Sequence, residues 1–344
     1  MQLESLYLTK QHPAYRIARE WLASPGETTA NGLRYIETAS AIERALSHVR
    51  PSRLVLFVSG FWRSGTTWLQ EYVAESCRAR TLAEPLSPLV GHREQDLILA
   101  GLHDLNLREG FIPGPTPPGA LLWRYLDGAI SGVVQDPYLL GSRRSLTESF
   151  RNLVVMKDVR MQFNLRSLHQ LYGAPVLHIR RHPCAVVSSL VAGKWRWDFE
   201  ELSLLALLDH LKDILEERFG VRQTDLARFD TDRFSRIAAY WALTERVATL
   251  ELDGSAWGAI IHYEDSVEHP PGVLNMLAEK FGIMSVDGAD YRADSASTGR
   301  EARGTHILSR KHAWRARLGA QQVERISEVV RALNPEAASA LEWR

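Results

Sequence analysis

The chain has 344 residues, of which 45% are hydrophobic and 24% charged, so it can bury a large core, and we expect a single domain over residues 1–344. Its 41 Lys and Arg balance its 41 Asp and Glu, which excludes the overall charge signature of a nucleic-acid-binding protein. Two cysteines are too few for a disulfide framework, and no apolar run approaches the roughly 18 residues of a membrane span, so we expect a cytoplasmic protein without an anchor.

Short apolar runs alternate with helical patterns along the chain, which predicts an α/β fold with a central parallel sheet and helices on both faces. The predicted buried strands are residues 53–60, 152–158, 174–181 and 257–265. The predicted helices are residues 66–78, 162–172, 183–192, 199–218, 232–252 and 320–333. These elements place the core of the domain at about residues 53–333.

A long loop is predicted at residues 108–123, which contain four prolines and three glycines. Two interpretations are open for this loop. It is either a lid over an acceptor site or a rigid excursion on the surface.

A glycine-rich turn follows the first predicted strand, where Gly60 to Thr67 reads GFWRSGTT. It keeps the outer glycines and the last threonine of a GxxxxGK[ST] phosphate-binding loop, but Thr66 replaces the lysine. A strand, a tight turn and a helix start would aim backbone N–H groups and the helix dipole at an anion. Arg63 supplies a cation from earlier in the loop. The alternative is a structural turn that binds no ligand and in which the glycines only allow the backbone conformation.

The segment RSGTTWL, Arg63 to Leu69, resembles the 5′-phosphosulfate loop of sulfotransferases that use 3′-phosphoadenosine 5′-phosphosulfate (PAPS). The resemblance implies a P-loop-NTPase-like sulfotransferase fold and PAPS as co-substrate. It also implies that the loop residues bind the co-substrate. In members of the family this loop binds the 5′-phosphosulfate, and a tryptophan side chain packs on the adenine. The implied contacts are Arg63, Ser64, Gly65, Thr66, Thr67 and Trp68.

The same resemblance implies a second anion site on a neighbouring strand. The family has a strand that ends in Arg-x-Pro and a Ser eight residues after the Arg, and VLHIRRHPCAVVSSL matches with Arg181, Pro183 and Ser189. An arginine and a hydroxyl can hold a dianionic phosphate, the arginine through two hydrogen bonds. Two anion sites on adjacent strands suit a nucleoside that is phosphorylated at both ends.

Two later segments also resemble the family. Tyr263 to Asp265 reads YED, which we interpret as an architectural element. Arg303 and Gly304, in a basic segment near the C-terminal end, resemble an Arg-x-Gly contact to the 3′-phosphate, and a solvated basic loop is the alternative.

Sulfuryl transfer to an acceptor hydroxyl, or less readily an amine, depends on positioning and on neutralising charge at the leaving phosphate, so it requires no metal. Arg63 and Lys157 are the predicted cations. Lys157 resembles the lysine that comes two residues before the catalytic histidine of eukaryotic cytosolic members. This chain departs from that pattern, because Asp158 and Val159 follow the lysine.

Glu84 is the predicted general base. It comes 17 residues after Thr67, where many bacterial and carbohydrate sulfotransferases have a glutamate. Partial desolvation would raise the pKa of such a carboxyl toward neutrality, and a surface glutamate is the alternative. The other candidates are Asp158, His103, His169, His178 and His182, of which we interpret His178 as a core or supporting residue.

The predicted acceptor is a small hydroxylated molecule in an apolar pocket, with Trp62, Trp123, Trp195 and Trp197 as its candidate lining. Two other functions remain open at this point. One is a P-loop kinase or NTPase, which would share the first loop and would need a Mg²⁺-binding acid at a second strand end. The other is a nucleotide-binding module without turnover.

Overall fold

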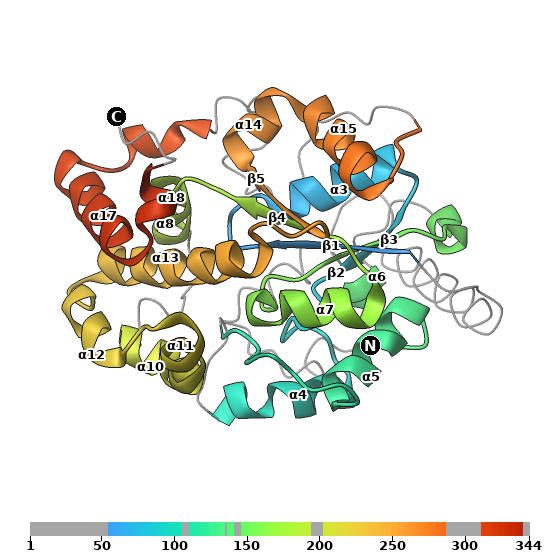
Figure 1. Cartoon of the computed structure of the whole chain (residues 1–344), viewed down its shortest axis with the longest axis horizontal. Helices are drawn as coiled ribbons and strands as arrows, with labels where there is room; N and C mark the ends of the chain where they lie inside the picture. Colours follow the sequence, from blue (N-terminus) through green and yellow to red (C-terminus); the bar gives the residue numbers. More distant parts are fainter. Residues whose placement is uncertain are drawn as a thin grey trace, which may run out of the picture.

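The protein is described by a computed structural model that covers residues 54–104, 110–134, 136–140, 146–193, 202–286 and 311–339. Five parallel strands form its central sheet in the order β2-β3-β1-β4-β5 (Figure 1). Their bounds are β1 Val55–Gly60, β2 Arg80–Ala83, β3 Val154–Lys157, β4 Val176–Arg180 and β5 Gly258–His262. The predicted parallel α/β class is confirmed.

Alternate residues of the strands face two different layers of helices. On β1, Val55 and Phe57 pack into the larger core cluster, and Leu56 and Val58 pack into the smaller one. A strand turns successive side chains to opposite faces, so a strand with helices on both faces must be apolar at every position. This requirement explains the continuous apolar runs of the sequence.

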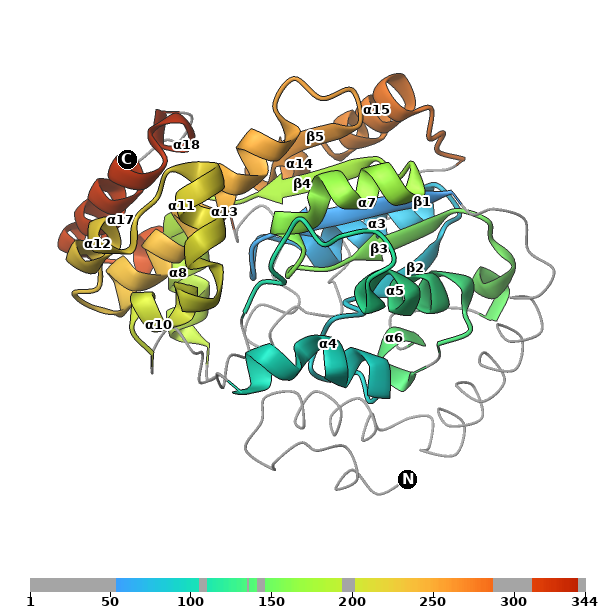
Figure 2. The ribbon, with the colours of Figure 1, turned by 60° about the horizontal axis from the view of Figure 1, so that its bottom comes forward.

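Helices cover both faces of the sheet (Figures 1 and 2). On one face lie α3 Thr66–Ser76, α14 Tyr263–Glu268 and α15 Pro270–Phe281, which pack on the smaller core cluster. On the other face lie α7 Leu165–Tyr172, α8 Pro183–Ala192 and α13 Arg233–Leu252, and α17 Ala320–Leu333 packs along α13. The remaining helices are α4 Arg93–Asp104, α5 Leu121–Ser131, α6 Pro137–Leu140, α10 Leu204–Leu208, α11 Lys212–Phe219, α12 Gln223–Leu226 and α18 Pro335–Ser339.

One strand was not predicted, and three predicted elements differ from the structure. The predicted strand 257–265 ends at His262, and α14 begins at Tyr263. Strand β2 was not predicted, because its sequence RTLA begins with two polar residues that are nevertheless buried. The predicted helix 199–218 is divided into α10, a 3₁₀ turn at Asp209–Leu211 and α11. The predicted helix 162–172 begins as a 3₁₀ turn at Gln162–Asn164 and continues as α7. By contrast, α17 has the predicted bounds.

The part of the predicted loop that the structure describes, residues 110–120, is fastened by Asn164. The Asn164 amide donates to the carbonyl oxygens of Ile112 and Pro113, each at 3.1 Å, and its oxygen accepts from Thr116 N–H at 2.9 Å. These bonds favour a rigid excursion over a lid. Within the ranges given above, no helix is both long and apolar enough to cross a membrane.

Candidate active site

The candidate site residues lie where the strands of the sheet end. Glu84 follows β2 directly, Lys157 is the last residue of β3, the glycine-rich turn follows β1, and Arg181 follows β4. Ala83 pairs with Lys157, and Gly60 pairs with Ile179, so these strand ends are level with one another. In an open parallel sheet, ligands bind at this carboxyl edge, where the chain connections change direction. The structure therefore brings together predicted residues that are up to 126 positions apart.

The turn between β1 and α3 has the backbone of an anion-binding loop. Arg63 has a φ of 66° and Gly65 a φ of 93°, and both values lie in the left-handed region. A Cβ on Gly65 would lie 2.4 Å from the Tyr263 ring, so both the backbone angle and the space favour glycine. Gly65 is the N-cap of α3 and has no side chain to cap the first-turn N–H groups, as is suitable for a helix N-terminus that binds an anion.

A buried hydroxyl in this turn indicates what the loop holds. Ser64 is fully buried, and its Oγ makes no hydrogen bond within the described residues. A buried hydroxyl without a partner costs about 1–3 kcal/mol, which a hydrogen bond to a ligand oxygen would offset. The loop thus fits an anion that has oxygen acceptors.

Two arginines connect this loop to the end of β4 and to α8. Arg63 Nε donates to Ser189 Oγ at 3.1 Å, and Arg181 Nη1 donates to the carbonyl oxygen of Arg63 at 2.9 Å. The Arg181 guanidinium also lies over the Tyr263 ring, 4.5 Å from its centroid. Burial and the neighbouring Arg181 charge together lower the pKa of Arg63. Because two like charges at short range repel, a bound anion between them would stabilise both.

Glu84 lies at the other end of the strand edge, between two hydrogen-bond donors. Lys157 Nζ donates to Glu84 Oε1 at 2.5 Å, and the Tyr138 hydroxyl donates to Oε2 at 3.2 Å. Lys157 Nζ also donates to Thr67 Oγ1 at 3.2 Å, so it joins the glutamate to the glycine-rich turn. The Glu84 side chain is 20% exposed and that of Lys157 only 5%. Glu84 is therefore an accessible carboxylate in a cationic setting.

The pKa of Glu84 departs from the sequence-based expectation. Burial alone would raise this pKa, but the charge and hydrogen bond of Lys157, the charge of Arg160 and the hydrogen bond of Tyr138 outweigh burial and lower it. The expected rise toward neutrality is thus wrong for the chain without ligands, because no sequence pattern showed how close the donors lie. Glu84 is ionised at neutral pH.

Asp158 fixes the backbone beside Glu84. Its two carboxylate oxygens accept the N–H groups of Leu86 and Arg160, both at 2.8 Å, and the residue is fully buried. Burial, which outweighs the nearby Arg160 charge, raises its pKa to about 6. With both oxygens occupied by backbone, Asp158 is placed to shape the turn rather than to receive an acceptor's proton.

The candidate histidines have other partners. His169 stacks on Trp257 at 4.8 Å, and His182 stacks on Trp314 at the same distance and caps α8 by accepting Cys184 N–H. The side chain of His103 lies outside the described residues.

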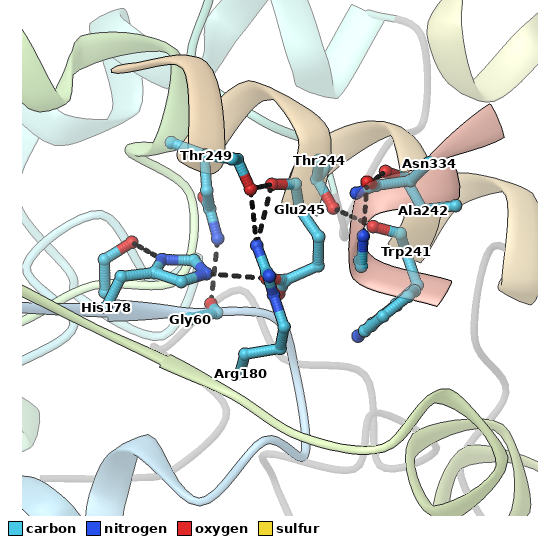
Figure 3. Close-up of polar contacts among 12 residues, drawn as sticks. Gly60, His178, Arg180, Trp241, Ala242, Thr244, Glu245, Thr249 and Asn334 are labelled. Atoms are coloured by element: carbon cyan, nitrogen blue, oxygen red, sulfur yellow. Dashed lines mark hydrogen bonds and ion pairs between the residues drawn. The ribbon is translucent and has the colours of Figure 1, made fainter. Parts of the chain in front are cut away.

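His178 belongs to a buried polar network behind the site, which Figure 3 shows. Its ring nitrogens lie 3.2 Å from Ser59 Oγ and 2.9 Å from Glu245 Oε2. Arg180 donates to the same Glu245 oxygen at 2.8 Å and to Thr249 Oγ1 at 2.6 Å. The network joins β1 and β4, which are followed by the two candidate anion sites, to α13. Sequence reasoning missed its partners on α13, although the i, i+2 spacing of His178 and Arg180 marks one face of β4.

The candidate aromatic residues lie mostly in the core. Trp68 is buried beside the loop, where it stacks on Tyr72 at 5.6 Å and meets Tyr263 edge-on at 6.0 Å. Trp62 and Trp123 are also buried, and the Trp123 indole N–H donates to the Pro117 carbonyl oxygen at 3.0 Å. The candidates that lie outside the described residues are Trp195, Trp197, Arg303 and Gly304.

In the described part of the chain, no three His, Cys, Asp or Glu side chains are grouped so that they could hold a metal ion.

Known proteins were compared with the chain in sequence and in structure. No protein-family model matches it, and no curated protein does. Among solved structures it is similar to the sulfotransferase domain from the curacin biosynthetic pathway (16% identity, 81% of this chain and 97% of that chain, TM-score 0.40). It is also similar to the sulfotransferase domain of the Synechococcus PCC 7002 olefin synthase (18% identity, 83% of this chain and 96% of that chain, TM-score 0.40). A third similar structure is mouse sulfotransferase SULT7A1 complexed with PAP (11% identity, 88% of this chain and 92% of that chain, TM-score 0.40).

Identities and TM-scores this low leave the case for a function to the residues of the site. These three solved structures are sulfotransferases.

Proposed function

We propose that the chain is a PAPS-dependent sulfotransferase that transfers a sulfuryl group to a hydroxyl of a small metabolite, lipid or natural product. The order of groups along the strand edge carries this proposal: Glu84 on β2, Lys157 on β3, the loop after β1, and Arg181 after β4. Neighbouring strands are about 4.8 Å apart, so the two ends of this row are separated by about 14 Å. The two anion sites suit a sulfuryl donor that is phosphorylated at both ends. The cation and the base then lie next to the sulfuryl group, where the acceptor would bind.

The residues divide into two binding groups. The turn of residues 63–67 and the start of α3 would hold the 5′-phosphosulfate, with the Ser64 hydroxyl as a donor. Arg181 and Ser189 would hold the 3′-phosphate. Bound PAPS supplies a sulfuryl group attached to a phosphate leaving group. Lys157 and Arg63 would neutralise the charge that develops on that phosphate, and no metal is needed for this.

Glu84 would accept the proton of the acceptor hydroxyl. Its carboxylate is ionised and partly exposed, as a general base must be before the reaction. The formal net charge of zero disfavours highly sulfated polysaccharides as acceptors. Cys77 and Cys184 are buried free thiols, in keeping with a cytoplasmic protein.

A P-loop kinase or NTPase is the competing function. Such an enzyme needs an acid at a second strand end to hold Mg²⁺. Asp158 follows β3, but both of its oxygens accept backbone N–H groups, and β4 is followed by Arg181. The geometry therefore favours a metal-free donor.

Calorimetric titration separates the two functions. We expect 3′,5′-ADP to bind without a metal, and ATP with Mg²⁺ to bind much more weakly or not at all. Replacing Arg181 by Leu should weaken 3′,5′-ADP binding by roughly 30-fold, since a lost charged contact costs about 2 kcal/mol or more. The same variant should lose much less affinity for 5′-AMP, which lacks the 3′-phosphate. Preference for ATP with Mg²⁺ would end the assignment.

A turnover assay separates the enzyme from a binding module. The chain is incubated with PAPS and a cell extract, and mass spectrometry searches for metabolites that have become heavier by one SO₃. We expect at least one such product, and none with heat-inactivated protein. Tight 3′,5′-ADP binding with no product from a broad panel of hydroxylated acceptors would favour a binding module.

A further inference from the structure

We infer that Tyr138 is a positioning residue, which keeps hold of Glu84 through Oε2 while Lys157 moves from Oε1 to the leaving phosphate. This inference rests on the proposed function. It gives the two carboxylate oxygens different tasks, because Oε2 remains anchored and Oε1 becomes available to the acceptor.

The two contacts of Glu84 come from different elements. Lys157, on β3, contacts Oε1, and Tyr138, on α6, contacts Oε2. Lys157 also donates to Thr67 Oγ1, at the N-terminal end of α3 and beside the phosphate loop. An anion in the loop would therefore compete with Glu84 for the lysine. Tyr138 is hydrogen-bonded to Glu84 and Asp136, which lie outside the loop, so Tyr138 would stay in place.

The hydrogen-bonding of α6 fixes Tyr138. Its backbone N–H donates to Asp136 Oδ1 at 2.7 Å, and Asp136 Oδ2 accepts Gly91 N–H at 3.1 Å. The helix begins at Pro137, whose fixed φ suits a first helical position. A phenol on such a support can hold a carboxylate in one rotamer, and transfer depends on this orientation.

Tyr138 acts as a donor and does not itself take up the proton. Burial, followed by the Glu84 charge, raises the pKa of Tyr138 well above its usual value, so the phenol keeps its proton. In the transfer, the acceptor oxygen forms a bond to sulfur, the bond from sulfur to the phosphate oxygen breaks, and the hydroxyl proton passes to Glu84 Oε1.

Four groups control the charge of Glu84. Lys157 and Arg160 favour its ionised form, the Tyr138 hydroxyl does the same through its hydrogen bond, and Asp158 is coupled to it as a nearby acid. Loss of the Tyr138 hydroxyl should therefore raise the pKa of Glu84. Because the base must be ionised, the acid limb of the rate profile should move to higher pH.

The test variant is Tyr138→Phe, which keeps the ring. Without this hydrogen bond the carboxylate is no longer held in one orientation, so kcat should fall by roughly 10-fold or more. The acid limb of kcat should move to higher pH, and the Kd for 3′,5′-ADP should stay within about 2-fold of the unaltered value. An unchanged kcat with an unchanged acid limb would overturn the inference.

Tyr125→Phe is the matched control. The Tyr125 hydroxyl donates to the carbonyl oxygen of Pro85 at 2.6 Å, in the same turn as Glu84, but it does not touch the carboxylate. This variant should lower the melting temperature and leave the acid limb in place. An equal shift of the acid limb in both variants would show that Tyr138 acts only by supporting the turn.

A second readout needs no turnover, so it separates failure of this inference from failure of the proposed function. The Glu84 carboxyl is followed by ¹³C NMR over a pH titration, with Glu84→Gln used to assign its signal. Its pKa should be higher in Tyr138→Phe than in the unaltered chain, and 3′,5′-ADP should raise it further by drawing Lys157 away. If Tyr138→Phe leaves the Glu84 pKa unchanged, the inference is wrong even if sulfated product is found.

Discussion

Glu84→Gln is expected to abolish sulfuryl transfer without weakening the binding of 3′,5′-ADP. The amide keeps the shape of the side chain but cannot accept the acceptor's proton, and general-base catalysis contributes roughly 10²–10⁴-fold to a rate. Glu84 follows β2, two strands away from the loop after β1, and its replacement leaves Lys157 free to bind the nucleotide, so the affinity for 3′,5′-ADP should stay the same or increase. The measurements are product formation from PAPS by mass spectrometry and the calorimetric Kd of each variant.

The control for this variant is Glu94→Gln on α4. Glu94 pairs with Arg124 near the surface, at 3.1 Å, and its replacement should change neither turnover nor nucleotide affinity. If Glu84→Gln turns over as fast as the unaltered chain, another group takes the proton, and Glu84 is not the base.

Glu245→Ala is expected to give the largest loss of stability. Glu245 is buried and pairs with both His178 and Arg180, so its removal leaves the Arg180 charge buried without this carboxylate. Breaking a buried pair on one side typically costs about 3–5 kcal/mol. The loss should appear as a lower free energy of unfolding in urea. Glu328→Ala, at an exposed position of α17, should change it by less than about 0.5 kcal/mol.

The contribution of Glu245 should also depend on pH. Burial would raise its pKa, but His178 and Arg180 outweigh burial and lower it below the ordinary value of 4.5. A carboxyl whose pKa is lowered on folding stabilises the folded chain above its unfolded pKa, and this stabilisation is lost as the pH falls. The difference between Glu245→Ala and the unaltered chain should therefore shrink below about pH 4.5. A cost under about 1 kcal/mol at neutral pH would contradict a supporting role for the network.

The strands of the sheet and the glycine-rich turn could be predicted because their causes are local. A strand covered on both faces is apolar throughout, as β1 is, and a left-handed turn requires glycine where Tyr263 leaves no room at Gly65. Helix α17 had the predicted bounds because Asn334 and Pro335 end its apolar pattern.

The parts that could not be predicted depend on residues far apart in the sequence. Strand β2 contains Arg80, which is fully buried and donates to the Ile130 carbonyl oxygen, so the strand lacks an apolar pattern. Tyr138 reaches Glu84 across 54 positions, and no periodicity connects them. The pKa of Glu84 depends on this contact and on Lys157, which explains why its direction of shift could not be deduced from the sequence.

The central claim is that two anion sites on neighbouring strands hold the two ends of one nucleotide. A crystal structure with 3′,5′-ADP tests it most directly. We predict the 5′-phosphate on the turn of residues 63–67 and the 3′-phosphate on Arg181 and Ser189, without a bound metal ion. A nucleotide with either phosphate held elsewhere, or with Mg²⁺ bridging its phosphate to Asp158, would contradict the account.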